Sequence, residues 1–94
     1  MFDSSIVNIP ERFDFSHHKK FTENTATALK NSKVSLVSLD FSRVSYLDSA
    51  ALGMIVYLHK KAVSAGKKVN IVNASGIASE ILTVANINKL IEVK

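Results

Sequence analysis

The middle of the chain carries a strand–helix–strand pattern, which restricts the fold more than any other feature of the sequence. Residues 34–41 (VSLVSLDF) are an almost continuous apolar, β-prone run, typical of a central strand covered on both faces. Residues 49–65 repeat apolar side chains at helical spacing, and Gly66 follows as a natural helix stop. Residues 68–72 (KVNIV) predict a second strand. Two strands joined through a helix form a parallel βαβ unit, so the sequence predicts an α/β protein.

Shorter patterns on both sides extend this unit. Residues 5–9 predict a strand that ends at Pro10, because proline cannot donate a ladder hydrogen bond. Residues 16–30 predict a helix with Ser16 as its N-cap, and residues 75–85 a shorter helix with Ser75 as its N-cap. Residues 89–93 predict a final strand or turn. The order β-α-β-α-β-α-β fits a single domain over residues 1–94.

Each predicted helix carries an apolar stripe that we expect to pack on the sheet. The stripes are Phe21, Thr25, Ala28 and Leu29 in the first helix, Leu52, Ile55, Val56, Ala62 and Val63 in the second, and Ile77, Ile81, Val84 and Ala85 in the third.

Composition and charge exclude several classes of function. Without cysteine there is no disulfide, no thiol nucleophile and no Cys-ligated zinc or iron–sulfur site. The N-terminus lacks the pattern of a secretory signal, and the longest apolar run, residues 50–58, is about half of a membrane span, so we expect a soluble, cytoplasmic protein. The net charge of +4 comes from scattered lysines without interleaved aromatics, which argues against direct nucleic-acid binding.

The sequence gives no sign of catalysis, a metal or a cofactor. His17 and His18 are adjacent and point in different directions, and His59 lies in the main helix, so no set of metal ligands has a credible spacing. No motif places a histidine beside a serine nucleophile, and no glycine-rich phosphate loop is present. We therefore expect a binding protein and not an enzyme.

Residues 44–53 (VSYLDSAALG) are the most informative segment, because they join the central strand to the main helix. Asp48 is a good N-cap, which places Ser49 in the first helical turn near unpaired N–H groups. Helix N-termini favour anions, so a phosphate on Ser49 would be tolerated, although Asp48 would repel it and destabilise the modified state locally. Composition alone favours the other interpretation, an ordinary helix start without function.

This segment resembles the signature of the STAS domain, the family of anti-sigma factor antagonists. Further segments similar to family sequences extend over nearly the whole chain: residues 11–15 (ERFDF), 39–44 (LDFSRV), 66–69 (GKKV) and 82–86 (LTVAN). The sequences RFDF and LDSAALGM resemble those of small single-domain members from proteobacteria.

The resemblance implies a STAS-like fold with a mixed β-sheet of about four strands and three to four helices. Two features depart from the family pattern. The family usually has two strands before the first helix, so the first N-terminal strand is either missing here or reduced to a stub at residues 1–4. The common glycine of the motif is replaced by Ala51, which adds a methyl group where a partner would approach.

The resemblance also implies a partner switch centred on Ser49, the serine directly after the motif aspartate. A serine kinase that is also the anti-sigma factor would phosphorylate Ser49, and a serine phosphatase, for example one carried by a response regulator, would reverse this. Only the unmodified form would bind the anti-sigma factor and release the sigma factor for transcription. Asp14 and Asp40 match polar family positions at the same end of the sheet.

Two further surfaces are candidates for partner binding. Ala50, Met54, Tyr57 and Lys61 form a second stripe on the main helix, which is either an exposed docking patch beside Ser49 or is covered by a loop or helix. The shortened N-terminus would leave a free sheet edge for a homodimer. Because STAS domains also serve as small cytoplasmic subunits of membrane transporters, including lipid transporters, a transporter subunit with an unmodified serine is the alternative function.

Overall fold

The computed structural model describes residues 3–94 and shows a four-stranded sheet in the order β1–β3–β5–β6. The strands are β1 (Asp3–Asn8), β3 (Val34–Asp40), β5 (Lys68–Val72) and β6 (Glu92–Val93). The predicted α/β fold with about four strands is confirmed. The prediction of a mixed sheet is wrong for the described strands, whose pairings are parallel, because a helix returns the chain to the same end of the sheet before each new strand.

A short parallel ribbon of β2 (Arg12–Phe13) and β4 (Tyr46–Leu47) lies at one end of this sheet. Two strands therefore precede the first helix, as in the family pattern, but β2 has only two residues and gave no periodic signal. The proposed stub at residues 1–4 falls partly outside the described residues, and Asp3 and Ser4 belong to β1.

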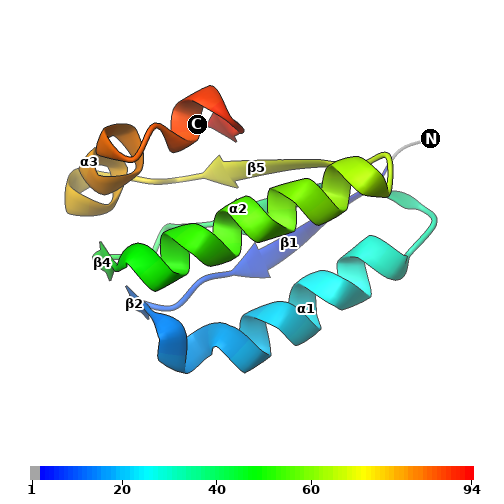
Figure 1. Ribbon diagram of the computed structural model, residues 1–94, viewed down its shortest axis with the longest axis horizontal. Helices are drawn as coiled ribbons and strands as arrows, with labels where there is room; N and C mark the ends of the chain where they lie inside the picture. Colours follow the sequence, from blue (N-terminus) through cyan, green and yellow to red (C-terminus); the bar gives the residue numbers. More distant parts are fainter. Residues whose placement is uncertain (1–2) are drawn as a thin grey trace.

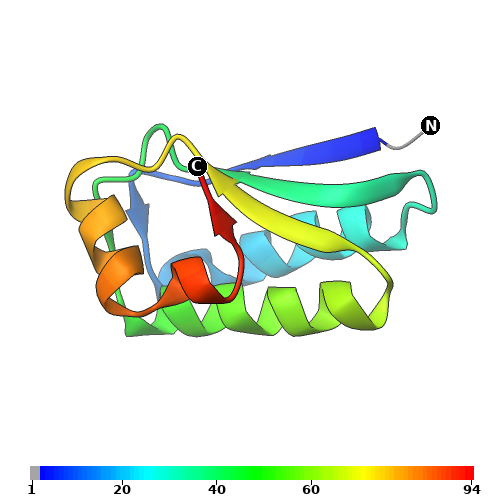
Figure 2. The ribbon, with the colours of Figure 1, turned by 90° about the horizontal axis from the view of Figure 1, so that it is seen from above.

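The main helices are α1 (His18–Lys30), α2 (Ser49–Ser64) and α3 (Gly76–Val84), with 3-10 turns η1 (Phe15–His17) and η2 (Ile87–Lys89). α1 and α2 run along one face of the sheet, and α3 lies near its end (Figures 1 and 2). The predicted βαβ unit is β3–α2–β5. Figure 2 shows the helices on one side of the sheet, so the expected cover on both faces of β3 is wrong. None of the helices in the described part of the chain is long and apolar enough to cross a membrane.

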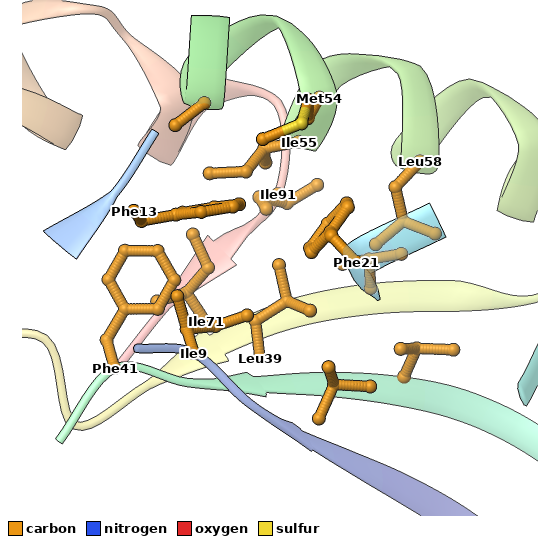
Figure 3. Packing of buried hydrophobic residues seen from close by; sticks show 14 of the residues in the cluster. Ile9, Phe13, Phe21, Leu39, Phe41, Met54, Ile55, Leu58, Ile71 and Ile91 are labelled. Carbon is orange, nitrogen blue, oxygen red and sulfur yellow. The ribbon is translucent and has the colours of Figure 1, made fainter. Parts of the chain in front are cut away.

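The hydrophobic core fills the space between the sheet and the α1–α2 layer (Figure 3). Phe13 is fully buried at its centre, with its ring centroid 5.2 Å from that of Phe21 and 6.3 Å from that of Phe41. The Phe41 ring meets Phe13 edge-on, an arrangement that aromatic pairs favour. Phe13 therefore fastens the β2–β4 ribbon to the core.

The predicted core face is confirmed in α1 but displaced in the other two helices. Phe21, Thr25 and Ala28 are buried, with Leu29 partly buried against them. α2 buries the predicted Ile55 and Ala62, but with Ala51, Met54 and Leu58, and α3 buries Ala78 and Leu82, neither of which was predicted. Of the side chains predicted to be core, Val63, Ile77, Val84 and Ala85 are exposed, and Leu52, Val56 and Ile81 are only partly buried. Apolar residues surround much of α2 and α3, so helical spacing alone does not select the buried face.

The helix ends show why the chain turns where it does. Ser16 is not the cap of the first helix: the Asp14 carboxylate accepts the backbone N–H of Ser16 at 3.0 Å and starts η1, from which α1 continues. Ser75 occupies the N-cap of α3 without a side-chain cap bond. After α2, Gly66 adopts a φ of +73°, which suits glycine, and Lys67 N–H closes the helix on the Ala62 carbonyl at 2.8 Å.

Candidate functional site

The β2–β4 ribbon sets the position of the residues that begin α2. Phe13 pairs with Leu47, and the backbone N–H of Asp48 donates to the Phe13 carbonyl at 3.3 Å. On the outer surface, the Arg12 guanidinium lies 4.8 Å from the centre of the Tyr46 ring. The start of α2 is thus held by backbone pairing on one side and by the buried Phe13 beneath.

Ser49 is the first residue of α2 and is exposed. The Asp48 carboxylate accepts the N–H of Ala51 at 2.9 Å, which confirms Asp48 as the N-cap, and the Asp48 carbonyl accepts the N–H of Leu52 at 3.1 Å. The N–H groups of Ser49 and Ala50 have no acceptor within residues 3–94. A free hydroxyl thus stands beside two free N–H donors, where the helix dipole favours negative charge.

Asp14 lies at the same end of the ribbon, because it follows Phe13 as Asp48 follows Leu47 in the paired strand. Its carboxylate accepts hydrogen bonds from the hydroxyl and N–H of Ser16, and the Arg12 guanidinium lies 3.1 Å away. The Ser16 hydroxyl, then its N–H and Arg12, lower the pKa of Asp14 despite some desolvation. The Asp14 carboxylate is therefore kept ionised at the end of the ribbon from which α2 begins.

Asp40 has a different structural role, at the end of β3. It accepts the N–H of Ser42 at 2.9 Å and the side-chain amide of Asn73 at 3.2 Å. The backbone bond from Ser42, followed by the Asn73 side chain, lowers the pKa of Asp40. Asp40 thus ties the loop after β3 to the loop after β5, at the same end of the sheet as Ser49.

The proposed docking stripe on α2 faces the groove between α1 and α2. Met54 is only 8% exposed and lines this groove with side chains of α1, so its expected availability to a partner is wrong. Tyr57 is exposed, with the Lys61 ammonium 5.3 Å from its ring centre, and Ala50 is half-buried. The neighbouring helix α1 thus covers Met54, one of the alternatives that the sequence left open, while Tyr57 and Lys61 stay exposed.

A second apolar surface, missed from the sequence, lies on the other side of α2. Leu52, three residues after Ser49, lines a groove between α2 and α3 with Ile81 and Val84. Val84 is 83% exposed, and Glu80 carries the charge in this lining. The sequence does carry a signal for this surface, since residues 76–85 contain more apolar side chains than one buried face can use.

Metal binding has no structural support in the described residues. No group of three His, Asp or Glu side chains within residues 3–94 is placed to hold a metal ion. The His17 ring packs edge-on against Phe13, and burial, with repulsion from Lys20, lowers the pKa of His17 although Asp14 opposes this. Neither the packing on Phe13 nor the lowered pKa links His17 to Ser49.

Comparison with known proteins agrees with the fold. A family model described as the STAS domain matches residues 3–94. A STAS-domain containing protein of Pseudomonas aeruginosa (strain UCBPP-PA14) is 29% identical over 87 residues, which cover 93% of this chain and 84% of the relative.

Solved structures with the same fold come from both signalling proteins and transporters. The Thermotoga maritima protein TM1081 has a TM-score of 0.84 at 20% identity, covering 100% of this chain and 75% of that one. The Bacillus cell fate determinant SpoIIAA, in its phosphorylated form, has a TM-score of 0.72 at 13% identity (100% and 85% covered). The STAS domain of a Vibrio cholerae SulP transporter has a TM-score of 0.77 at 18% identity (96% and 71% covered). The family match over residues 3–94 therefore establishes that this chain belongs to the STAS-domain family.

Proposed function

We propose that this protein is an anti-sigma factor antagonist whose binding is switched by phosphorylation of Ser49. The observation that carries the proposal is the exposed Ser49 hydroxyl at the start of α2, between the capping carboxylate of Asp48 and the apolar groove that begins at Leu52. The unmodified protein binds an anti-sigma factor that is also a serine kinase, and the sigma factor is released. A serine phosphatase restores the binding form. The protein acts by binding and not by catalysis.

The docking surface in this proposal is centred on Ser49 and extends over Leu52, Ile81 and Val84. These side chains give a partner an apolar contact of the kind found at the centre of protein interfaces. This surface replaces most of the stripe expected from the sequence, because Met54 is buried. Tyr57 and Lys61 lie on the opposite side of α2 and contribute only if a partner also reaches over the α1–α2 groove.

The phosphate acts as a switch through charge and desolvation. It adds about −1.5 to −2 charges at pH 7, directly after Asp48 in the chain and at the end of the ribbon that carries Asp14. Docking would then bury a dianion beside existing negative charge, which is unfavourable unless the partner supplies cations. A loss of roughly 3–4 kcal/mol weakens binding more than a hundredfold. Asp48 also keeps the phosphate from binding tightly to the helix end, so the modified side chain stays available to a phosphatase.

The SpoIIAA structures support a surface switch of this kind. SpoIIAA, described as an anti-sigma factor antagonist, has been solved in unphosphorylated and phosphorylated forms, and both share this chain's fold, with TM-scores of 0.69 and 0.72. A fold that accommodates both states is what a switch acting at the interface requires. The phosphorylation site itself comes to this chain through the motif at Asp48–Ser49.

The test measures binding by isothermal titration calorimetry to anti-sigma factors with a kinase domain from the same organism. Wild type and Ser49→Ala are expected to bind one of them, and Ser49→Asp to bind at least tenfold more weakly. Ser32→Asp adds the same charge at an exposed position after α1 and serves as the control, with wild-type affinity expected. Equal affinity of all four proteins for that partner would disprove the switch.

The likeness to the SulP domain favours a second candidate function, a cytoplasmic subunit of a membrane transporter. In that role the domain braces a transport protein, and Ser49 need not be modified. Affinity purification of the tagged protein separates the two functions. Recovery of a transport ATPase, equally with wild type and Ser49→Asp, would favour the subunit role, whereas recovery of a serine kinase with wild type alone favours the switch.

A further inference from the structure

The outer edge of β1 is a long free edge of the sheet. β1 has six residues and pairs with β3 on one side, and no strand of residues 3–94 pairs with its other side. The opposite edge is formed by β6, which has two residues and carries Glu92 beside Lys94. Shortness and charge are the devices by which proteins protect sheet edges, and β6 has both.

The backbone groups that point outward from β1 can be identified from its bonds. The N–H of Asp3 donates to Lys33 O at 3.2 Å, and the N–H of Ile9 donates to Asp40 O at 3.1 Å. Backbone direction alternates along a strand, so the odd-numbered residues face β3. The N–H and C=O groups of Ser4, Ile6 and Asn8 consequently point to the free edge.

The side chains of β1 do not protect this edge. Residues 4–9 carry no charge, and Ile6 is 64% exposed in the middle of the strand. Pro10, which removes the next outward N–H, lies beyond the last strand residue, Asn8. An uncharged edge with a central exposed β-branched side chain is suited to pairing with another strand.

We propose that β1 pairs with β1 of a second copy of this chain, antiparallel, about a two-fold axis through Ile6. In this register Ile6 faces Ile6 of the second copy, and Ser4 faces Asn8 in both directions. Every outward N–H and C=O of the three even-numbered residues then has a partner, since residues that exchange both bonds lie directly opposite each other. Moving the axis to Ser5 or Val7 pairs fewer of these groups within Asp3–Asn8.

A second copy is favoured as the occupant because the edge is complementary to itself. The two strands meet without a like charge between residues 4 and 9, and the groove along β1 on the helix side is lined by polar α1 side chains that include a single charge, Lys20. The contact is small compared with the roughly 1,200–2,000 Å² of stable interfaces, so the dimer is expected to be weak, with a dissociation constant in the micromolar range. This inference does not depend on the proposed function.

Amide hydrogen exchange followed by NMR tests the register directly. The amides of Ser5 and Val7, bonded to β3, are expected to be protected at every protein concentration. The amides of Ser4, Ile6 and Asn8 are expected to exchange rapidly in dilute protein and to slow at least tenfold at about millimolar concentration, where micromolar dimers are populated. Concentration-independent rapid exchange of these three amides would overturn the proposal, as would their protection in a monomer.

Sedimentation velocity of the full chain provides the matched mutational test. Wild type is expected to shift from one to two times 10.3 kDa as concentration rises. Ile6→Lys, which places two like charges on the axis, is expected to weaken association at least tenfold. Ile77→Lys changes an isoleucine of nearly equal exposure, 61%, on α3 and is expected to leave association unchanged. Dimerisation that survives Ile6→Lys, or that Ile77→Lys abolishes, would place the interface elsewhere and overturn the proposed β1 pairing. A wild-type protein that stays monomeric at every concentration would also refute it.

Discussion

The N-cap of α2 provides a quantitative prediction about the region of Ser49. The Asp48 carboxylate makes one cap bond, 2.9 Å to the N–H of Ala51, and its negative charge lies at the positive end of a 16-residue helix. Asp48→Ala removes both and is expected to lower the free energy of unfolding by about 1 kcal/mol, within a usual range of roughly 0.5–2. Asp48→Asn keeps an acceptor and loses only the charge, for an expected cost of about 0.3–1 kcal/mol.

Urea denaturation followed by circular dichroism measures both variants. With a denaturant slope of about 2 kcal/mol per molar, Asp48→Ala is expected to shift the unfolding midpoint by about half a molar, and Asp48→Asn by less. The same loss lowers Tm by about 4–8 °C in a domain of this size. If Asp48→Ala unfolds at the wild-type midpoint, the cap bond does not stabilise the start of α2, and the structural account of how Ser49 is positioned fails.

A double-mutant cycle extends this prediction to the switch. Ser49→Asp places a second carboxylate beside Asp48, and the resulting repulsion is expected to destabilise the protein. In the background of Asp48→Asn this repulsion is absent, so Ser49→Asp is expected to be less destabilising there. The difference between the two backgrounds measures the coupling. An equal effect of Ser49→Asp in both would show that Asp48 does not oppose negative charge on Ser49.

Three further predictions concern the rest of the fold. Phe13→Ala is expected to cost about 3–5 kcal/mol and to give a Tm well below that of Phe13→Leu, because the fully buried ring fastens the ribbon to the core; equal Tm values would contradict this. Gly66→Ala is expected to cost about 1–2 kcal/mol in urea denaturation, since φ is +73° there, and an unchanged midpoint would argue against the left-handed turn. Burial lowers the pKa of His17 below 6.5, so the unfolded chain binds its proton more readily and stability falls as the pH drops below that value. The wild-type Tm is therefore expected to fall from about pH 7.5 to about pH 5.5, less so in His17→Phe, with His18→Gln as the control; identical pH profiles would refute it.

The sequence predicted the parts of the fold in which local signals agree. The apolar run at 34–41, the helix between Asp48 and Gly66 and the strand at 68–72 are all present with nearly the expected bounds. Each has a pattern, a cap or a stop that physics ties to one structure. The ribbon of β2 and β4 was not predicted, because a two-residue strand has no period and forms only through pairing between segments distant in the chain.

Helix orientation was less predictable than helix existence. In α3 almost any face would be apolar, and contacts with η2 and the ribbon decide that Ala78 and Leu82 point inward and Val84 outward. In α2 the position of α1 decides that Met54 is covered. The motif at Asp48–Ser49 depends on local capping and was placed correctly, whereas the surface around it depends on tertiary packing.

The most direct test of the proposed switch joins modification to binding in one experiment. The protein is incubated with ATP and an anti-sigma factor kinase that binds it, and intact mass and peptide mapping locate any phosphate. The purified modified form is then titrated with the same partner. We expect one phosphate, on Ser49, and affinity more than a hundredfold lower than that of the unmodified protein. A phosphate at another residue, or full affinity with Ser49 phosphorylated, would contradict the account.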